Sequence, residues 1–298
     1  MPEASDSRVA VYIDFDNIVI SRYDQVNGRG SFMKDRGTSR PSPEFAARLK
    51  RATVDIGAII DFAASFGTIV LTRAYADWSA PVNADYRAQL VGRAVDLVQL
   101  FPAAAYGKNG ADIRLAVDAV EDMFRLEDLT HVVIVAGDSD YVPLAQRCKR
   151  LGRYVIGVGV AGSTARSLAA ACDEFATYDR LPGVPAVAPE PDPEPAPEKK
   201  PATKKTKAQK DAAPPAQTPQ EEAAALLERA LRLESERTDD DWVNASALKN
   251  LLKRMDPSFS EKDLGHRSFT DFIRAHTEVA ELREEGNIRH VRLVAARR

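Results

Sequence analysis

The N-terminal part of the chain alternates between short apolar segments and longer amphipathic ones. The short segments are apolar on both faces and rich in β-branched residues, which is typical of buried parallel strands. They lie at residues 9–13, 68–71, 97–101, 131–135 and 154–158. Apolar residues at helical spacing predict helices over 45–63, 86–95, 113–124, 141–151 and 164–172. This alternation predicts an α/β fold, a doubly wound parallel sheet with helices on both faces.

The C-terminal part follows a different pattern. Three apolar helical faces are formed by Ala225, Leu226, Ala230 and Leu233, by Val243, Leu248, Leu251 and Leu252, and by Leu264, Phe269, Phe272 and Ile273. Two strand-like segments, 279–283 and 288–294, then flank a turn at Gly286-Asn287. Helices followed by a β-hairpin predict a small α+β winged helix-turn-helix domain.

Between these regions, Pro, Ala, Glu and Lys dominate and the segment cannot form a core. We therefore predict a domain over residues 1–181, a disordered linker over 182–220 and a second domain over 221–298. The linker is acidic first and basic afterwards. A solvated spacer is the favoured interpretation, and a weak electrostatic contribution to binding of nucleic acid is the alternative.

Composition narrows the function classes. The chain of 298 residues has a formal net charge of −3, so any affinity for nucleic acid must come from local basic surface. Its two cysteines, Cys148 and Cys172, are too few for a zinc site or a disulfide framework and are expected to be buried. The N-terminus lacks a signal-peptide pattern, and no stretch is apolar enough for a membrane span. We therefore expect a cytoplasmic protein without membrane contact.

Acidic residues follow three of the predicted strands. Asp14 ends the first strand, Asp112 follows the glycine-containing loop after the third, and Asp138 and Asp140 follow the fourth. In an open parallel sheet, ligands bind beyond the carboxyl ends of the strands, so these carboxylates are expected to converge. Converging carboxylates repel unless a cation or a proton lies between them, and oxygen ligands suit Mg²⁺ or Mn²⁺. The alternative is that Asp14, Asp112 and one acid of the last pair cap the turns that follow them.

Asp118 is a weaker candidate for the same site. It lies six residues after Asp112 and four after Arg114, so a helical ion pair with Arg114 is the alternative to a supporting role.

Three motifs in order resemble the NYN domain of the PIN-like nuclease superfamily, including a bacterial branch once classed as a domain of unknown function. They are Tyr12-Ile-Asp-Phe-Asp-Asn17, Lys108-Asn-Gly-Ala-Asp112 and Val135-Ala-Gly-Asp-Ser-Asp-Tyr141. The resemblance implies a nuclease whose catalytic and metal-binding acids are Asp14, Asp112, Asp138 and Asp140, with Asn17 and Ser139 in support. RNA, rather than DNA, is also implied by the resemblance.

The chain departs from that family at two places. Phe15 stands where bacterial relatives often have glycine, and residues 28–41 look like a long basic insertion directly after the first strand. The insertion carries Arg29, Lys34, Arg36 and Arg40. It is either a loop that grips substrate or a mobile surface loop.

The C-terminal region resembles the OST-HTH (LOTUS) domain. The resemblance rests on Asp241-Trp-Val243, Leu248 to Leu252, Asp256-Pro-Ser-Phe-Ser260, Asp263-Leu-Gly265 and Ser268-Phe-Thr-Asp-Phe-Ile273. It implies binding of RNA, either single-stranded or G-rich and structured, and in some members a protein partner. A homodimer is also compatible with it.

Basic side chains are the candidates for phosphate contacts. In the N-terminal domain these are Lys108 and Arg36, and in the C-terminal domain Lys249, Lys253, Arg254, Lys262, Arg267, Arg289 and Arg292. His266 is expected to be a surface or packing residue.

The resulting hypothesis is metal-assisted hydrolysis of RNA phosphodiesters, in which the ion activates water and stabilises charge. A histidine base is not required, and His131 is the only histidine in residues 1–181. One alternative is a catalytically silent RNA-binding adaptor. Another is a phosphatase of the haloacid dehalogenase type, suggested by Asp14-Phe-Asp16, although the Val expected two places after the second Asp occurs one position late, at Val19.

Overall fold

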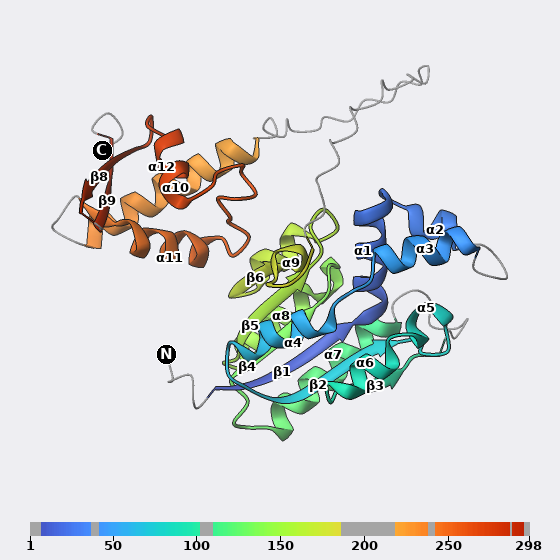
Figure 1. Cartoon of the computed structure of the whole chain (residues 1–298). Helices are drawn as coiled ribbons and strands as arrows, with labels where there is room; N and C mark the ends of the chain where they lie inside the picture. The colour runs from blue at the N-terminus through green and yellow to red at the C-terminus, as the bar shows by residue number, and fades with distance from the viewer. Residues whose placement is uncertain are drawn as a thin grey trace, which may run out of the picture. The chain divides into compact units, whose positions relative to one another are not determined.

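The computed structural model describes residues 7–36, 42–101, 110–185, 218–237, 242–286 and 288–294, and the chain divides into two compact units (Figure 1). The N-terminal unit contains a parallel sheet, and the C-terminal unit is a small α+β domain. Most of the predicted linker, residues 186–217, lies outside the described residues. In the described part of the chain, no helix is both long and apolar enough to cross a membrane.

The N-terminal sheet has six strands, all parallel, in the order β3-β2-β1-β4-β5-β6. The strands are β1 (Arg8–Asp14), β2 (Thr68–Ala76), β3 (Asp96–Gln99), β4 (His131–Val135), β5 (Tyr154–Gly159) and β6 (Glu174–Thr177). The prediction of a doubly wound parallel sheet is confirmed, although β6 was not predicted. The chain adds β2 and β3 on one side of β1 and β4 on the other, so the topology reverses between β1 and β4. Ligands bind at such a switch point.

Helices cover both faces of the sheet because its strands are apolar on both sides. In β1, Val9, Val11 and Ile13 pack on one core, and Ala10 and Tyr12 on the other. The first core is closed by α1 (Phe15–Asn27), α4 (Ile56–Ala64) and α6 (Arg87–Gly92). The second is closed by α7 (Gly110–Arg125), α8 (Val142–Arg150) and α9 (Arg166–Ala171).

The helix predicted over 45–63 is two helices in the structure. The first, α3 (Pro43–Arg51), begins at the predicted cap, where the amide of Phe45 donates to Ser42 Oγ. The chain is extended after Ala52, and Asp55 caps α4. Two tyrosine hydroxyls bind the backbone between α3 and α4. The amide of Val54 donates to Tyr86, and the amide of Asp55 donates to Tyr178. The predicted helix 86–95 is shorter in the structure, where it is α6. A short helix, α5 (Pro81–Ala84), precedes it.

The insertion does not follow the first strand directly, because α1 comes between them. It contains the short helix α2 (Ser31–Asp35), and α2 and α3 pack against α1, away from the sheet (Figure 1). We call residues 28–36 and 42–51 the α2–α3 arm. Tyr23 of α1 and Phe32 and Phe45 of the arm form its small core. Residues 31–35 are therefore helical and not a loop, whereas 37–41, which include Arg40, lie outside the described residues.

The C-terminal unit has three helices and an antiparallel sheet of order β7-β9-β8. Its elements are α10 (Pro219–Arg237), β7 (Val243–Asn244), α11 (Ala245–Met255), α12 (Phe269–Ala275), β8 (Ala280–Glu285) and β9 (Ile288–Leu293). Two residues assigned to helices differ from prediction: Val243 lies in β7, and Leu264 lies in a turn before α12. The helices followed by a hairpin confirm the predicted α+β architecture.

Candidate active site

Asp14 lies at the switch point of the sheet, at the end of β1. Its side chain is only 4% exposed. One carboxylate oxygen accepts from the amide of Asn17 at 3.2 Å, so Asp14 is the N-cap of α1. The other accepts from the hydroxyl of Tyr141 at 2.8 Å. Both the expected strand-end position and the alternative capping role are therefore present in one side chain.

Burial dominates the electrostatics of Asp14. Desolvation raises the pKa of its carboxyl to about 7, against the two hydrogen bonds that lower it, and the negative charges of Asp112 and Asp16 add to the rise. This carboxyl is thus close to its titration point at neutral pH, and a nearby positive charge would return it fully to the ionised form.

Tyr141 connects Asp14 to Asp112. Asp112 lies in the first turn of α7 and is half-buried, and the hydroxyl of Tyr141 is near enough to act on its pKa. Desolvation raises the pKa of Asp112, Tyr141 opposes this, and Asp138 and Asp140 raise it further. Burial and the neighbouring carboxylates raise the pKa of Tyr141 as well, so its phenol stays protonated and donates.

Asp138 and Asp140 are exposed at the end of β4. Asp138 caps the short 3₁₀ helix η2 (Ser139–Tyr141), accepting from the amide of Asp140 at 3.2 Å and from Ser139 Oγ at 3.3 Å. Their charges act on Asp112, and the charge of Asp112 acts on Asp14. The four predicted acids therefore form one electrostatically coupled set, which we call the acid cluster.

Asn17 fixes the two strand ends relative to each other. Its Oδ1 atom accepts from the amide of Gly137 at 3.0 Å, which ties the first turn of α1 to the end of β4. A Cβ atom on residue 137 would lie 3.3 Å from Asn17 Oδ1 and 3.4 Å from the carbonyl oxygen of Ser163. Glycine thus allows the close approach, and the supporting role of Asn17 stays a prediction.

A second polar network lies beyond the ends of β2 and β3 and was not predicted. Asn83 Nδ2 donates to Asp16 Oδ1 at 2.6 Å, and Gln99 Nε2 donates to Asp77 Oδ1 at 2.9 Å. The amide of Asp77 donates to Asp16 Oδ2 at 3.4 Å, which joins the two pairs. Burial raises the pKa of Asp16, whereas the hydrogen bonds from Ser79 lead those that lower the pKa of Asp77. The polar edge therefore extends from β4 to β3.

Comparison with known families identifies both units. A model of the NYN domain matches residues 8–179, and a model of the OST-HTH/LOTUS domain matches residues 215–292. The chain belongs to the NYN family. Its C-terminal unit is an OST-HTH domain, so the resemblance inferred from the sequence motifs is confirmed for both units. NYN domains are PIN-like nucleases, and OST-HTH domains are associated with RNA binding.

Comparison with individual proteins adds less. No curated protein sequence matches the chain. The crystal structure of a protein of unknown function from Vibrio parahaemolyticus is similar, with 20% sequence identity and a TM-score of 0.43. The match covers 59% of this chain and 95% of that one.

Asp118 of the NYN domain forms its polar contacts with residues outside the acid cluster. It is 8% exposed, receives Arg114 Nε at 2.9 Å and accepts from the hydroxyl of Tyr75 at 3.1 Å. The predicted alternative, a helical ion pair with Arg114, is what the structure contains. A parallel group lies one turn further along α7, where Asp122 binds Arg73 and accepts from the Tyr12 hydroxyl. Both groups attach α7 to the sheet.

The predicted phosphate contacts of the OST-HTH domain divide into two groups. Lys249 is paired with Glu261 at 2.5 Å, Arg292 with Glu281 at 2.5 Å, and Arg289 lies 3.7 Å from Glu284, so all three already have acidic partners. The other predicted contacts are exposed: Lys253, Arg254, Lys262 and Arg267. His266 packs beside Phe272, as expected of a packing residue. Lys108 lies outside the described residues.

The raised pKa of Asp14 predicts that the metal-free protein becomes less stable as pH rises. In the unfolded chain this carboxyl has its ordinary pKa of 3.8, against about 7 in the fold. Between these values the folded state holds the extra proton, so its contribution is complete below about pH 4 and lost as pH rises through 7. Asp14→Asn keeps a capping side chain and should remove this dependence, which is worth at most about 4 kcal/mol.

Urea unfolding in EDTA at pH 5 to 8 measures the effect. Asp85→Asn is the control variant, because Asp85 is exposed at the end of α5. Asp24→Asn is less suitable as a control, because Asp24 accepts a hydrogen bond from the arm. A wild type that loses no stability relative to Asp14→Asn over this range would contradict the assignment.

Proposed function

We propose that this chain is a metal-dependent ribonuclease, in which the NYN domain hydrolyses RNA at the acid cluster and the OST-HTH domain binds RNA. The observation that carries the proposal is the environment of Asp14. A buried carboxylate with one hydroxyl and one amide as partners, beside Asp112, needs a proton or a cation to balance its charge. A divalent cation at this sheet edge would provide that balance.

The donor atoms fit such an ion. The cluster offers only carboxylate oxygens, the ligand type that Mg²⁺ and Mn²⁺ prefer. Within the described ranges, no three side chains of Asp, Glu, His or Cys stand close enough to hold a metal by themselves. Mg²⁺ does not need such a cage, because it usually keeps several waters and binds through one or two carboxylates together with substrate phosphate. Asp14, Asp112, Asp138 and Asp140 would hold it here.

The surrounding residues organise the reaction. When bound, the ion supplies an activated water and stabilises negative charge on the phosphate. Tyr141 donates to the buried carboxylate of Asp14 and so orients it beside Asp112. Asn17 holds the loop that carries Asp138 against α1. The exposed pair Asp138 and Asp140 faces the side from which RNA must approach.

Metal removal is the direct test. We expect wild-type protein to cleave end-labelled single-stranded or G-rich RNA with Mg²⁺ or Mn²⁺, and cleavage to fall at least about 100-fold in EDTA. Excess metal should restore it. RNA binding by the OST-HTH domain should persist in EDTA, since its basic side chains carry it.

Binding without cleavage at any divalent metal would favour the silent RNA-binding adaptor over the nuclease. The phosphatase alternative is disfavoured, because the motif that suggested it lies in a domain of the NYN family. A cytoplasmic location, a protein partner of the OST-HTH domain and a homodimer stay predictions from the sequence.

A further inference from the structure

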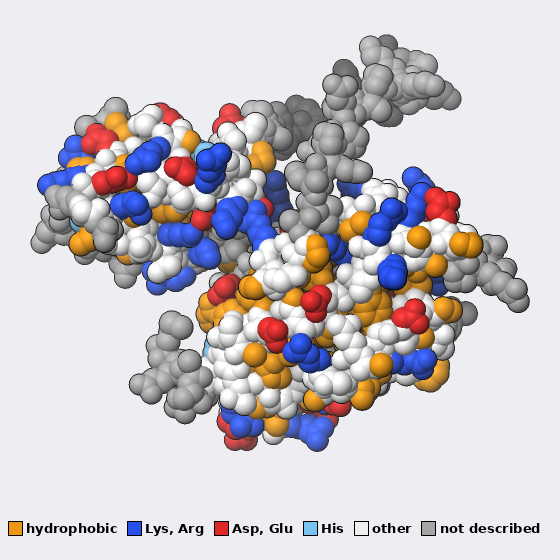
Figure 2. Space-filling model, in the orientation of Figure 1, with side chains coloured by type: hydrophobic (Ala, Val, Ile, Leu, Met, Phe, Trp, Pro, Cys, Tyr) orange, Lys and Arg blue, Asp and Glu red, His pale blue; other side chains and the backbone are white. Residues whose placement is uncertain are grey.

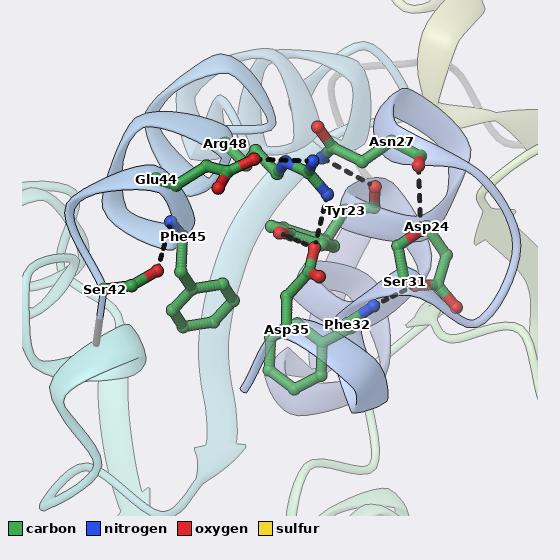
Figure 3. Close-up of polar contacts among 10 residues, drawn as sticks. All are labelled: Tyr23, Asp24, Asn27, Ser31, Phe32, Asp35, Ser42, Glu44, Phe45 and Arg48. Atoms are coloured by element: carbon green, nitrogen blue, oxygen red, sulfur yellow. Dashed lines mark hydrogen bonds and ion pairs between the residues drawn. The ribbon is translucent and has the colours of Figure 1, made fainter. Parts of the chain in front are cut away.

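The α2–α3 arm has a small aromatic core of its own. The rings of Tyr23, Phe32 and Phe45 pack with centroids 5.5 to 5.9 Å apart. Asp24 of α1 accepts from the amide of Phe32 at 2.8 Å (Figure 3). It also accepts from the amide of Gly30 at 2.9 Å, and the two bonds fix the turn into α2. The arm is thus held in one place relative to α1, and α1 begins at Asp14.

The acidic residues of the arm are all engaged inside it. Asp35 accepts from the Tyr23 hydroxyl at 2.7 Å and from Arg48 at 2.8 Å. Glu44 receives the other nitrogen of the same guanidinium at 2.9 Å. Figure 3 shows these side chains turned toward one another between α1, α2 and α3. The two carboxylates therefore stabilise the arm through these contacts.

The remaining basic residues of the arm are different. Arg29, Lys34, Arg36, Lys50 and Arg51 are all exposed, and none forms an ion pair with another described residue. The arm has six basic residues against two acidic ones, although the whole chain carries a formal net charge of −3. Such a local excess on an ordered surface attracts a polyanion.

The helix α1 connects this surface with the acid cluster. Both α2, whose C-cap is Arg36, and α3 pack against α1, and Asp14 is the N-cap of the same helix. Figure 2 shows Lys and Arg side chains over α2 and α3. Carboxylates alone repel RNA, so a strand that approaches them needs positive charge beside them.

We propose that the α2–α3 arm binds the phosphate backbone of single-stranded RNA and leads the strand to the acid cluster. This rests on the proposed function for its substrate. The predicted gripping role of the insertion then belongs to an ordered helical arm, and Arg48, Asp35 and Tyr23 are its positioning residues.

Crosslinking of the full chain tests the location. RNA that contains 4-thiouridine is irradiated with wild-type protein in EDTA, and the crosslinked peptides are identified by mass spectrometry. We expect crosslinks within residues 28–36 or 42–51 in addition to those in the OST-HTH domain. Crosslinks confined to the OST-HTH domain would overturn the proposal, whether or not the protein cleaves RNA.

Salt dependence tests the contacts. In the variant Arg29→Ala/Lys34→Ala/Arg36→Ala, three phosphate contacts are lost, so the slope of log affinity against log salt should decrease by about 2, given about 0.7 per contact on a single strand. Arg125→Ala removes an exposed arginine from the opposite end of α7 and should leave the slope unchanged. Equal slopes for the triple variant and wild type would count against the arm.

Cleavage kinetics separate the arm from the chemistry. For a long RNA, the variant Arg29→Ala/Lys34→Ala/Arg36→Ala should raise KM about 10-fold with little change in kcat. A trinucleotide too short to reach the arm should be cleaved by this variant at the wild-type rate. If wild type cleaves RNA and the triple variant has an unchanged KM, the arm is refuted and the nuclease proposal stands. Wild type that does not cleave refutes the nuclease, and the crosslinks then still decide on the arm.

Discussion

Asp138→Asn is expected to reduce RNA cleavage by at least about 100-fold, equivalent to about 3 kcal/mol of transition-state stabilisation, while the fold stays intact. The carboxylate of Asp138 is exposed and belongs to the acid cluster, so its loss would remove one charged ligand of the proposed ion. An asparagine oxygen can still accept from the Asp140 amide and cap η2. The expected result is a folded, RNA-binding protein with little activity.

Asp128→Asn is the matched control. Asp128 is an exposed aspartate that pairs with Arg8, at the start of β1 and the opposite edge of the sheet. Its cleavage rate should equal that of wild type, and thermal unfolding should show that both variants are folded. Full activity of Asp138→Asn would rule out the acid cluster as the place of the chemistry, even if the protein cleaves RNA.

Asp122→Ala is expected to cost about 3 kcal/mol of stability. Asp122 is 4% exposed, and it binds both Arg73 and the hydroxyl of the fully buried Tyr12. Its removal leaves a largely buried guanidinium and a buried hydroxyl without their acceptor. Denaturant unfolding should show a lower midpoint.

A surface ion pair provides the comparison. Asp61 lies 3.0 Å from Arg93, and both side chains are exposed. Asp61→Ala should therefore change stability by no more than about 1 kcal/mol. If the two variants lose equal stability, the Tyr12–Asp122–Arg73 group does not anchor α7 to the sheet.

The placement of the acids in the acid cluster could be predicted from the sequence because strand ends converge in a parallel sheet. Asp14 and Asp138 follow two apolar runs, and a single topological rule brings their ends together. Asp112 belongs to the first turn of α7, and its charge acts on Asp14. That these acids hold a metal and carry the chemistry stays a prediction.

Other features depend on contacts between distant residues, which no local pattern contains. The break between α3 and α4 interrupts a continuous helical apolar pattern, and the hydroxyls of Tyr86 and Tyr178 hold it from 32 and 123 residues away. The network of Asp16, Asn83 and Gln99 also joins separate segments. The helix α1, by contrast, was missed although its signal is local, since Phe15, Ile18, Val19 and Tyr23 follow a helical repeat.

The helix α1 also sets a distance. Asp14 caps its first turn, and Tyr23 holds the arm nine residues later, a separation of about 14 Å along a straight helix. A rigid helix between the RNA-binding arm and the acid cluster would keep the two at a fixed distance. The length of α1 would then determine how far from the bound phosphates the strand is cut, whatever the identity of the bases.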